Sequence, residues 1–170
     1  MIIRGHNVEL RALTREDGPR VLQMLAHPEV AARWGDFTSD PSRLERDFFA
    51  DSVAEVPLAI CHGDEVIGVI QYGEENEPDY RHASIDLFLD GSYLGRGLGT
   101  AAVRALATYL FVELGHHRIT IDPAADNKRA IGSYLKVGFR PVGVMRRYER
   151  GPDGTWHDNL LMDLLPTDLK

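Results

Sequence analysis

The sequence predicts an α+β domain, with a mixed sheet and helices on both of its faces. The 170 residues are 44% hydrophobic and 26% charged, which is ordinary for a globular chain that can bury a sizeable core. Several segments alternate apolar and polar residues, as half-buried strands do, and others repeat apolar residues at helical spacing. The predicted strands first follow one another and then alternate with helices, which combines antiparallel pairs with a βα unit.

The N-terminal part predicts one strand and two helices. Residues 8–13 alternate in polarity, as expected of a strand. Thr14 is a typical helix N-cap residue, and the helix after it is expected to end at Pro28. Phenylalanine and leucine at helical spacing predict a second helix over residues 42 to about 54.

The middle of the chain predicts three strands. Residues 58–61 and 66–72 are apolar and flank a short turn, which indicates a hairpin. The acidic stretch 73–79 then predicts a loop. Residues 81–89 alternate clearly: Ala83, Ile85, Leu87 and Leu89 share one face, and Ser84, Asp86 and Phe88 share the other.

The C-terminal part begins with a glycine-rich loop at residues 94–100. Apolar residues at helical spacing follow it and predict a long helix that ends at Gly115. No repeat or linker-like composition divides the chain, so residues 1–170 are expected to form one domain. The remaining expected elements are a strand at 118–122, a helix at 127–137 and a hairpin of strands at 142–150 and 156–164.

Charge and cysteine content narrow the possible partners. The net charge of −7 disfavours a nucleic-acid partner and favours a cationic ligand, although it also simply keeps a protein soluble. Cys61 is the single cysteine, which fits a reducing, cytoplasmic location. No apolar run approaches ~18 residues and the opening residues resemble no secretory signal, so no membrane partner is expected. The scattered histidines predict no metal site, and a monomer and a dimer are both compatible with the sequence.

The glycine-rich loop lies between a predicted strand and a predicted helix. Gly95, Gly97 and Gly99 let the backbone come close to a ligand, and the helix N-terminus offers free N–H groups, which suits a phosphate. A plain turn into a helix would also explain the glycines. A P-loop requires Lys followed by Ser or Thr, and here the loop continues with Thr-Ala. The dinucleotide motif G-x-G-x-x-G has another spacing, although Asp122 follows at a strand end.

The run from Ile85 to Phe139 contains several motifs together. They are Ile-Asp in a strand, Leu-Gly-Arg-Gly-Leu-Gly-Thr, Asp-Pro at a strand end, Asn-x-Arg-Ala-Ile and Tyr-x-Lys-x-Gly-Phe. This run resembles the GNAT superfamily of N-acetyltransferases, and within it most of all the aminoglycoside 6′-N-acetyltransferases. The N-terminal segment is instead similar to ribosomal-protein N-terminal acetyltransferases. Leu94 stands where the family usually has Gln or Arg, so one side-chain contact to phosphate is expected to be missing.

The resemblance implies the GNAT fold, in which acetyl-CoA lies between two parallel strands that splay apart, here 83–89 and 118–122. The pantetheine arm would pair with the first strand near Leu87 and Leu89, and an N–H there would hold the thioester oxygen. The coenzyme-binding residues that the resemblance implies are Leu87, Phe88, Leu89, Leu94, Gly95, Arg96, Gly97, Leu98, Gly99, Thr100, Asn127, Arg129, Ala130, Tyr134 and Lys136.

The resemblance also implies acetyl transfer to an amine, with Asp86, Asp122 and Tyr134 as catalytic residues. An aliphatic ammonium has a pKa of roughly 10, so it must lose a proton before it attacks. Asp86 would bind the ammonium and accept that proton, or else it lies on a solvated strand face. Asp122 would face the same cleft, or merely precede a turn. Tyr134 would protonate the departing thiolate, or simply pack as a helix aromatic.

Two carboxylates at one cleft favour a polycationic substrate, and an aminoglycoside acetylated at its 6′-amine is the preferred one. The alternatives are a protein N-terminus, another polyamine or a siderophore amine, or a module that binds acyl-CoA without turnover. Trp34 is expected in a loop at the substrate mouth, and otherwise as a core anchor. Gln71 and Tyr72 are expected beside the substrate at a strand end, next to an acidic loop that is alternatively a solvated turn.

Overall fold

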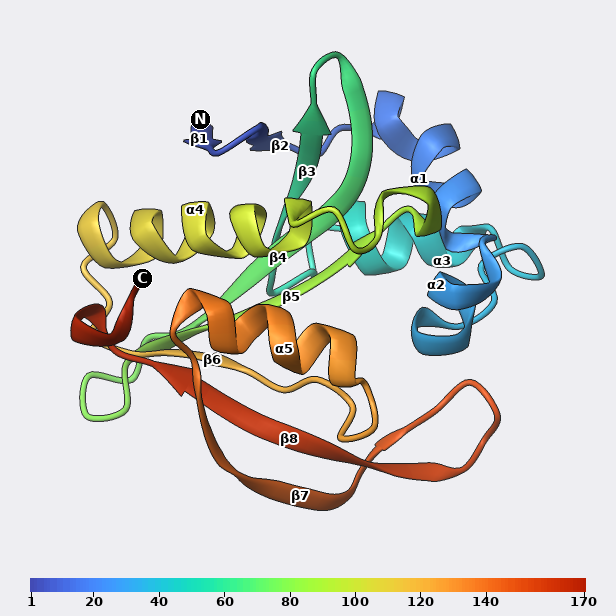
Figure 1. Cartoon of the computed structure of the whole chain (residues 1–170). Helices are drawn as coiled ribbons and strands as arrows, with labels where there is room; N and C mark the ends of the chain where they lie inside the picture. Colours follow the sequence, from blue (N-terminus) through green and yellow to red (C-terminus); the bar gives the residue numbers. More distant parts are fainter.

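The computed structural model describes residues 1–170. All of its strands belong to a single eight-stranded sheet (Figure 1). Its strands are β1 (Ile2–Gly5), β2 (Val8–Ala12), β3 (Val56–His62), β4 (Glu65–Glu75), β5 (His82–Leu89), β6 (Ile119–Ile121), β7 (Arg140–Arg150) and β8 (Trp156–Leu164). Their order across the sheet is β1-β2-β3-β4-β5-β6-β8-β7. Only β5 and β6 run parallel, and every other neighbouring pair is antiparallel. The mixed α+β architecture is therefore confirmed.

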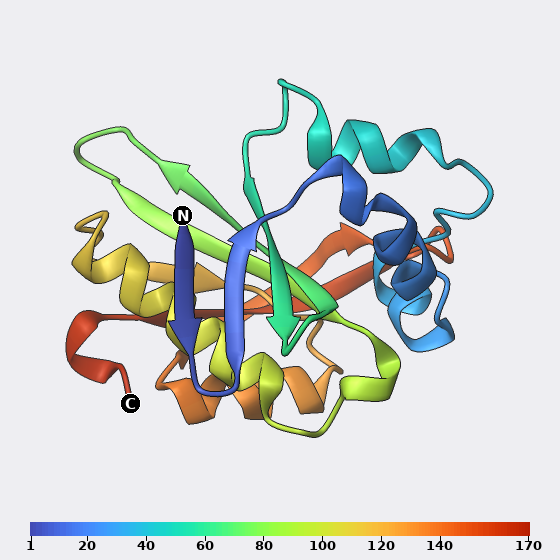
Figure 2. The same ribbon diagram turned by 90° about the horizontal axis from the view of Figure 1, so that it is seen from above.

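Helices cover both faces of this sheet (Figures 1 and 2). The α-helices are α1 (Gly18–Leu25), α2 (Pro28–Trp34), α3 (Ser42–Leu44), α4 (Leu98–Val112) and α5 (Lys128–Val137), and a π-helical segment, Glu45–Phe49, continues α3. Short 3-10 turns lie at Arg15–Asp17, Gly91–Tyr93 and Pro166–Asp168. No helix combines the length and the apolar character that a bilayer crossing requires.

Two hydrophobic clusters fix the two helical layers on the sheet. The larger one joins α4 and α5 to the sheet and includes Leu106, Ile70 and Met162, all of them inaccessible to solvent. The smaller one joins α1, α2 and the π-helical segment to the opposite face through Met24 and Phe48. Burying such side chains contributes about 1.5–3 kcal/mol each, so the two layers hold the intervening strands firmly.

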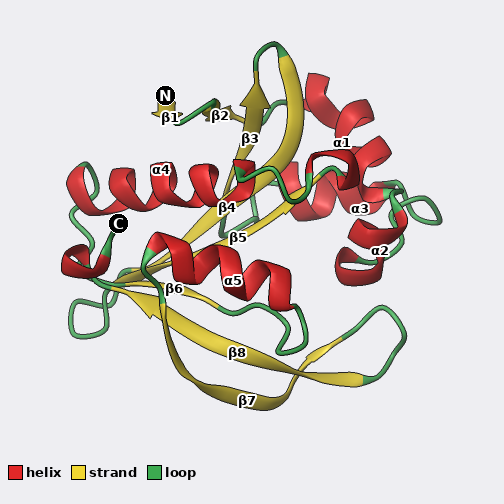
Figure 3. Cartoon of the chain, in the orientation of Figure 1, coloured by secondary structure: helices red, strands yellow, loops and turns green.

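The parallel pair separates after two residue pairs, and we call the region between β5 from Ile85 onward and the chain after β6 the cleft. β5 and β6 are paired only at Ala83↔Ile119 and Ser84↔Thr120, although β5 continues to Leu89. After β6 the chain stays beside β8 and no longer pairs with β5. The N–H of Leu160 on β8 donates a hydrogen bond to the carbonyl of Pro123 at 2.8 Å. Figure 3 shows β5 and the chain after β6 diverging. The second half of β5 therefore lacks a strand partner on that side.

The structure departs most from the sequence prediction in four places. β1 was not predicted, and β4 extends through residues 73–75 because it pairs there with β5 as far as Glu75↔His82. Pro28 begins α2 as well as following α1, since proline fits the first turn of a helix, where its missing N–H costs nothing. The helix predicted over residues 42–54 ends at Phe49, where the backbone turns extended at Ala50.

Candidate active site

Asp86 lies at the centre of the splayed region, on β5. It is directly opposite Gln71 of β4, and its Oδ1 accepts a hydrogen bond from the N–H of Leu87 at 2.9 Å. The cleft leaves it accessible to solvent, but protein atoms surround the carboxyl group on most sides. This burial raises the pKa of Asp86 to about 7, and the Leu87 N–H only partly opposes the shift.

Nearby negative charges raise the pKa of Asp86 further. They come from three side chains: Asp122, Glu149 and Glu55. These carboxylates belong to three different parts of the fold, namely the chain after β6, strand β7 and the turn before β3. A carboxyl group among like charges takes up a proton more readily. Asp86 can therefore hold or release a proton near neutral pH, as a general base must.

Tyr134 reaches the same region from α5. It is buried, and its ring centroid lies 6.1 Å from that of Phe139. Burial raises the pKa of Tyr134, and the charges of Asp86 and Asp122 raise it further, so the phenol keeps its proton at neutral pH. The structure thus brings Asp86, Asp122 and Tyr134 together. The packing on Phe139 also agrees with the alternative that Tyr134 is a packed aromatic.

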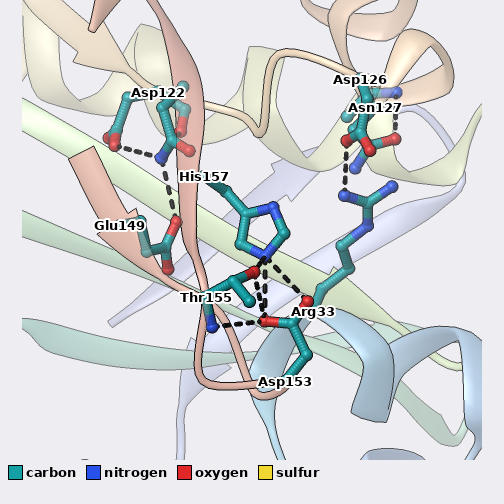
Figure 4. Close-up of polar contacts among 10 residues, drawn as sticks. Arg33, Asp122, Asp126, Asn127, Glu149, Asp153, Thr155 and His157 are labelled. Atoms are coloured by element: carbon teal, nitrogen blue, oxygen red, sulfur yellow. Dashed lines mark hydrogen bonds and ion pairs between the residues drawn. The ribbon is translucent and has the colours of Figure 1, made fainter. Parts of the chain in front are cut away.

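Asp122 follows β6 directly and is held by Asn159 of β8. The Nδ2 of Asn159 donates to Oδ2 of Asp122 at 3.2 Å and to Oε2 of Glu149 at 2.9 Å (Figure 4). Burial raises the pKa of Asp122; the hydrogen bond from Asn159 opposes that shift and the charge of Glu149 adds to it. The cleft therefore contains an acidic pair, Asp122 and Glu149, in addition to Asp86.

Glu149 and Asn159 are site residues that no sequence motif marks. The hairpin that carries them was predicted, but its register depends on a bulge between Met145 and Glu149 on β7. Within the bulge Arg147 has a φ of 49°, a conformation that is uncommon for arginine and that the sequence does not predict. Alternation along a strand cannot assign faces across such an irregularity.

The glycine-rich loop connects β5 to α4. Gly95 and Gly97 have φ values of 73° and 78°, and a Cβ atom on either would meet no atom within 4 Å. Gly97 is the N-cap of α4, so the first N–H groups of this helix have no partner within it. Open space in front of unpaired N–H groups suits a diphosphate. Arg96 lies nearby, with its guanidinium carbon 5.0 Å from the centre of the Tyr93 ring.

The other predicted coenzyme-binding residues differ in their surroundings and in their distance from the loop. Leu94 packs against the larger hydrophobic cluster, as expected of a side chain without a phosphate contact. Asn127 is the N-cap of α5 and accepts a hydrogen bond from the N–H of Ala130 at 3.3 Å. Lys136 is not brought to the loop: it is exposed near the C-terminal end of α5, and its carbonyl lies 3.4 Å from Arg104, midway along α4.

The predicted substrate residues divide between the two faces of the sheet. Trp34 ends α2 and is not in a loop; its ring lies 4.9 Å from that of Phe88, which shares a face of β5 with Asp86. Tyr72 is buried in the larger hydrophobic cluster below α4, so its contact with the substrate stays a prediction. Neighbouring residues of a strand point to opposite faces, so Gln71 and Tyr72 cannot both face the cleft.

Two ion pairs join α2 to the beginning of α5, beside the cleft. Arg33 contacts Asp126 at 2.8 Å, and Glu29 contacts Arg129 at 3.1 Å (Figure 4 shows the first pair). All four side chains are substantially exposed, so each pair contributes at most about 1 kcal/mol. Arg129, predicted to contact the coenzyme, is therefore held by a contact that a ligand phosphate can readily replace.

Comparison with known proteins shows similarity to acetyltransferases in sequence and in structure. The model of the family described as acetyltransferase (GNAT) domain matches residues 7–140. Aminoglycoside N(6′)-acetyltransferase type 1 of Klebsiella pneumoniae is 30% identical over 165 residues, which cover 87% of this chain and 79% of that protein. Spermidine N(1)-acetyltransferase of Escherichia coli K12 is 28% identical over 145 residues, 83% and 77% of the two chains. Among solved structures, RimJ of Mycobacterium smegmatis in complex with CoA-disulfide superposes with a TM-score of 0.81 at 26% identity, over 99% of this chain and 88% of that one.

Proposed function

This chain belongs to the acetyltransferase (GNAT) domain family, and we propose that it acetylates a primary amine of a small polycation, preferably the 6′-amine of an aminoglycoside. Acetyltransferases of this family use acetyl-CoA, whose thioester supplies an activated acetyl group. The observation that carries the proposal is the gathering of Asp86, Asp122, Glu149 and Glu55 around one cleft. Such a concentration of negative charge attracts a ligand with several ammonium groups.

Two features of this chain suit the coenzyme. The loop at residues 95–100 offers unpaired N–H groups to a diphosphate, with open space above Gly95 and Gly97. Beyond Ser84, β5 has a side without a strand partner, where an extended arm can add its own hydrogen bonds. Asp86 lies on this part of β5, and the loop follows β5 along the chain. The residues present therefore fit acetyl-CoA.

The proton transfers then follow from the positions of two residues. Asp86 would bind the substrate ammonium and accept its proton, since a carboxylate with a pKa of about 7 is a base matched to neutral pH. The amine nitrogen forms the new bond to the acetyl carbon while the bond from that carbon to sulfur breaks. Tyr134, which keeps its proton, would supply it to the departing thiolate and would take up the second proton, which the nitrogen loses as it becomes an amide.

The substrate can be tested by following thiol release with acetyl-CoA and a panel of amines. We expect kanamycin and tobramycin to be acetylated faster than spermidine or a peptide N-terminus, and gentamicin components without an accessible 6′-amine to be spared. Cells that express the chain should also tolerate kanamycin better. Brisk acetylation of spermidine alone would move the assignment to the polyamine class, which the Escherichia coli relative represents. Brisk acetylation of peptides alone would contradict a small polycation altogether.

The pH dependence should follow Asp86. The base must be ionised to accept a proton, and its pKa is raised to about 7, so kcat/KM is lost as the pH falls through that value. We expect a decline of about tenfold per pH unit below the inflection, measured with an aliphatic amine that stays charged throughout. Asp86→Asn should remove this inflection. A wild-type rate that does not change between about pH 5.5 and 8 would contradict the role of Asp86 as the base.

A further inference from the structure

We infer that Asn159 is a positioning residue, which holds Asp122 and Glu149 together as a subsite for a second ammonium group of the substrate. This inference rests on the proposed function and specifies the substrate further. It requires that the substrate carry at least two amines: one that reacts at Asp86 and another that binds at the Asp122–Glu149 pair.

The contacts of one nitrogen atom define this pair. Asn159 is 1% exposed, and its Nδ2 lies 3.0 Å from the carbonyl of Asp122, 3.2 Å from Oδ2 of Asp122 and 2.9 Å from Oε2 of Glu149. An amide nitrogen carries only two hydrogens, so three acceptors share two donors. The two carboxylates are therefore held close together with hydrogen-bonding capacity to spare, which a cationic donor can fill.

The other end of the same amide has no partner. Asn159 Oδ1 is buried and accepts no hydrogen bond. Leaving a buried acceptor unpaired costs about 1–3 kcal/mol of stability. A residue whose only role is to hold the chain at the end of β6 is not expected to carry that cost. The side chain thus has one end held by two carboxylates and another, buried end without a hydrogen-bond partner in the protein.

The backbone of the hairpin brings the two side chains onto one face. Glu149 is paired with His157, two residues from Asn159 on the same strand, so Glu149 and Asn159 are diagonal neighbours across the hairpin. The backbone of Asn159 also forms an isolated bridge with Ala124, just after Asp122. Asn159 is therefore the residue at which the hairpin and the chain after β6 meet.

An amide is suited to this task because it adds no charge. The hydrogen bond from Asn159 favours the ionised form of Asp122, against the burial and the charge of Glu149 that raise the pKa of this carboxyl group. A lysine or arginine there would neutralise the pair, whereas asparagine leaves it anionic and available to an ammonium group. Asp86 is influenced by both charges, which places the pair near the reacting amine.

The inference can be tested with Asn159→Leu, which keeps the size of the side chain but removes the donor. Kanamycin would be compared with 6-amino-6-deoxyglucose, a sugar that carries the reacting amine alone. We expect KM for kanamycin to rise about tenfold with little change in kcat, as for the loss of binding common to ground and transition states. The kcat/KM of the single-amine sugar should stay within about twofold of the wild type.

Glu149→Gln provides the matched variant, because it removes one charge of the pair and leaves the contacts between Asn159 and Asp122. It should raise KM for kanamycin on its own, and adding Asn159→Leu should then have little further effect, since both act on the same subsite. CoA affinity and thermal stability of each variant serve as controls. If Asn159→Leu does not fold, Glu149→Gln decides the outcome.

Three results would overturn the inference: equal losses with both substrates, full additivity of the two substitutions, or an unchanged KM for kanamycin in Glu149→Gln. Failure of the proposed function would look different. In that case the wild-type protein would release thiol with neither amine, whatever the variants did.

Discussion

Asp86→Asn is expected to lower kcat at saturating acetyl-CoA by about 10²–10⁴-fold, the usual effect of losing a positioned general base. The amide retains the shape of the side chain but can neither accept the amine proton nor offset the charge of the ammonium. Asp86 is not part of the diphosphate loop, so the Kd for CoA should change little. The measurements are steady-state thiol release and calorimetric titration with CoA.

Asp64→Asn is the matched control for this prediction. It makes the same chemical change at an exposed residue in the turn between β3 and β4. We expect that variant to have the wild-type rate. Similar, mild losses in the two variants would mean that Asp86 is only a solvated strand residue.

Gly97→Val is expected to weaken CoA binding by at least about tenfold. Gly97 has a φ of 78°, a conformation that costs a residue with a Cβ about 1–2 kcal/mol. Its missing side chain also leaves open the space in front of the α4 N-terminus, where the diphosphate would lie. Valine would occupy that space and pull the backbone away from its present conformation. Calorimetric titration with CoA measures the effect.

Gly115→Val separates backbone strain from loss of binding. Gly115 also has a positive φ, 67°, and open space around it, but it follows the opposite end of α4. The two variants should lose similar amounts of thermal stability, and only Gly97→Val should lose CoA affinity. Equal CoA affinity in the two variants would place the diphosphate elsewhere.

The parts of the fold that were predicted have local signals. The alternation in β5, the helical spacing in α4 and the glycines between them are each complete within one segment. The parts that were missed depend on distant partners. The acidic end of β4 is a strand because β5 pairs with it, and β1 exists because β2 offers it an edge. Pairing can override composition, which a single segment does not reveal.

The residues of the candidate site also divide into those with a local sequence signal and those that depend on distant partners. Asp86, Asp122 and Tyr134 stand in recognisable motifs, and the structure brings them together. Glu149 comes to the cleft only because a bulge in β7 sets its register against β8. Gln71 and Tyr72 are neighbours on one strand, and the sequence alone does not tell which of the two faces the ligand.

The most direct test of this account is a crystal structure of the protein with bound CoA. We expect the diphosphate at the N–H groups of residues 97–100, the pantetheine arm along the unpaired side of β5, and the sulfur beside Asp86 and Tyr134. A coenzyme bound elsewhere on the molecule, or a β5–β6 pair closed along its whole length, would contradict it.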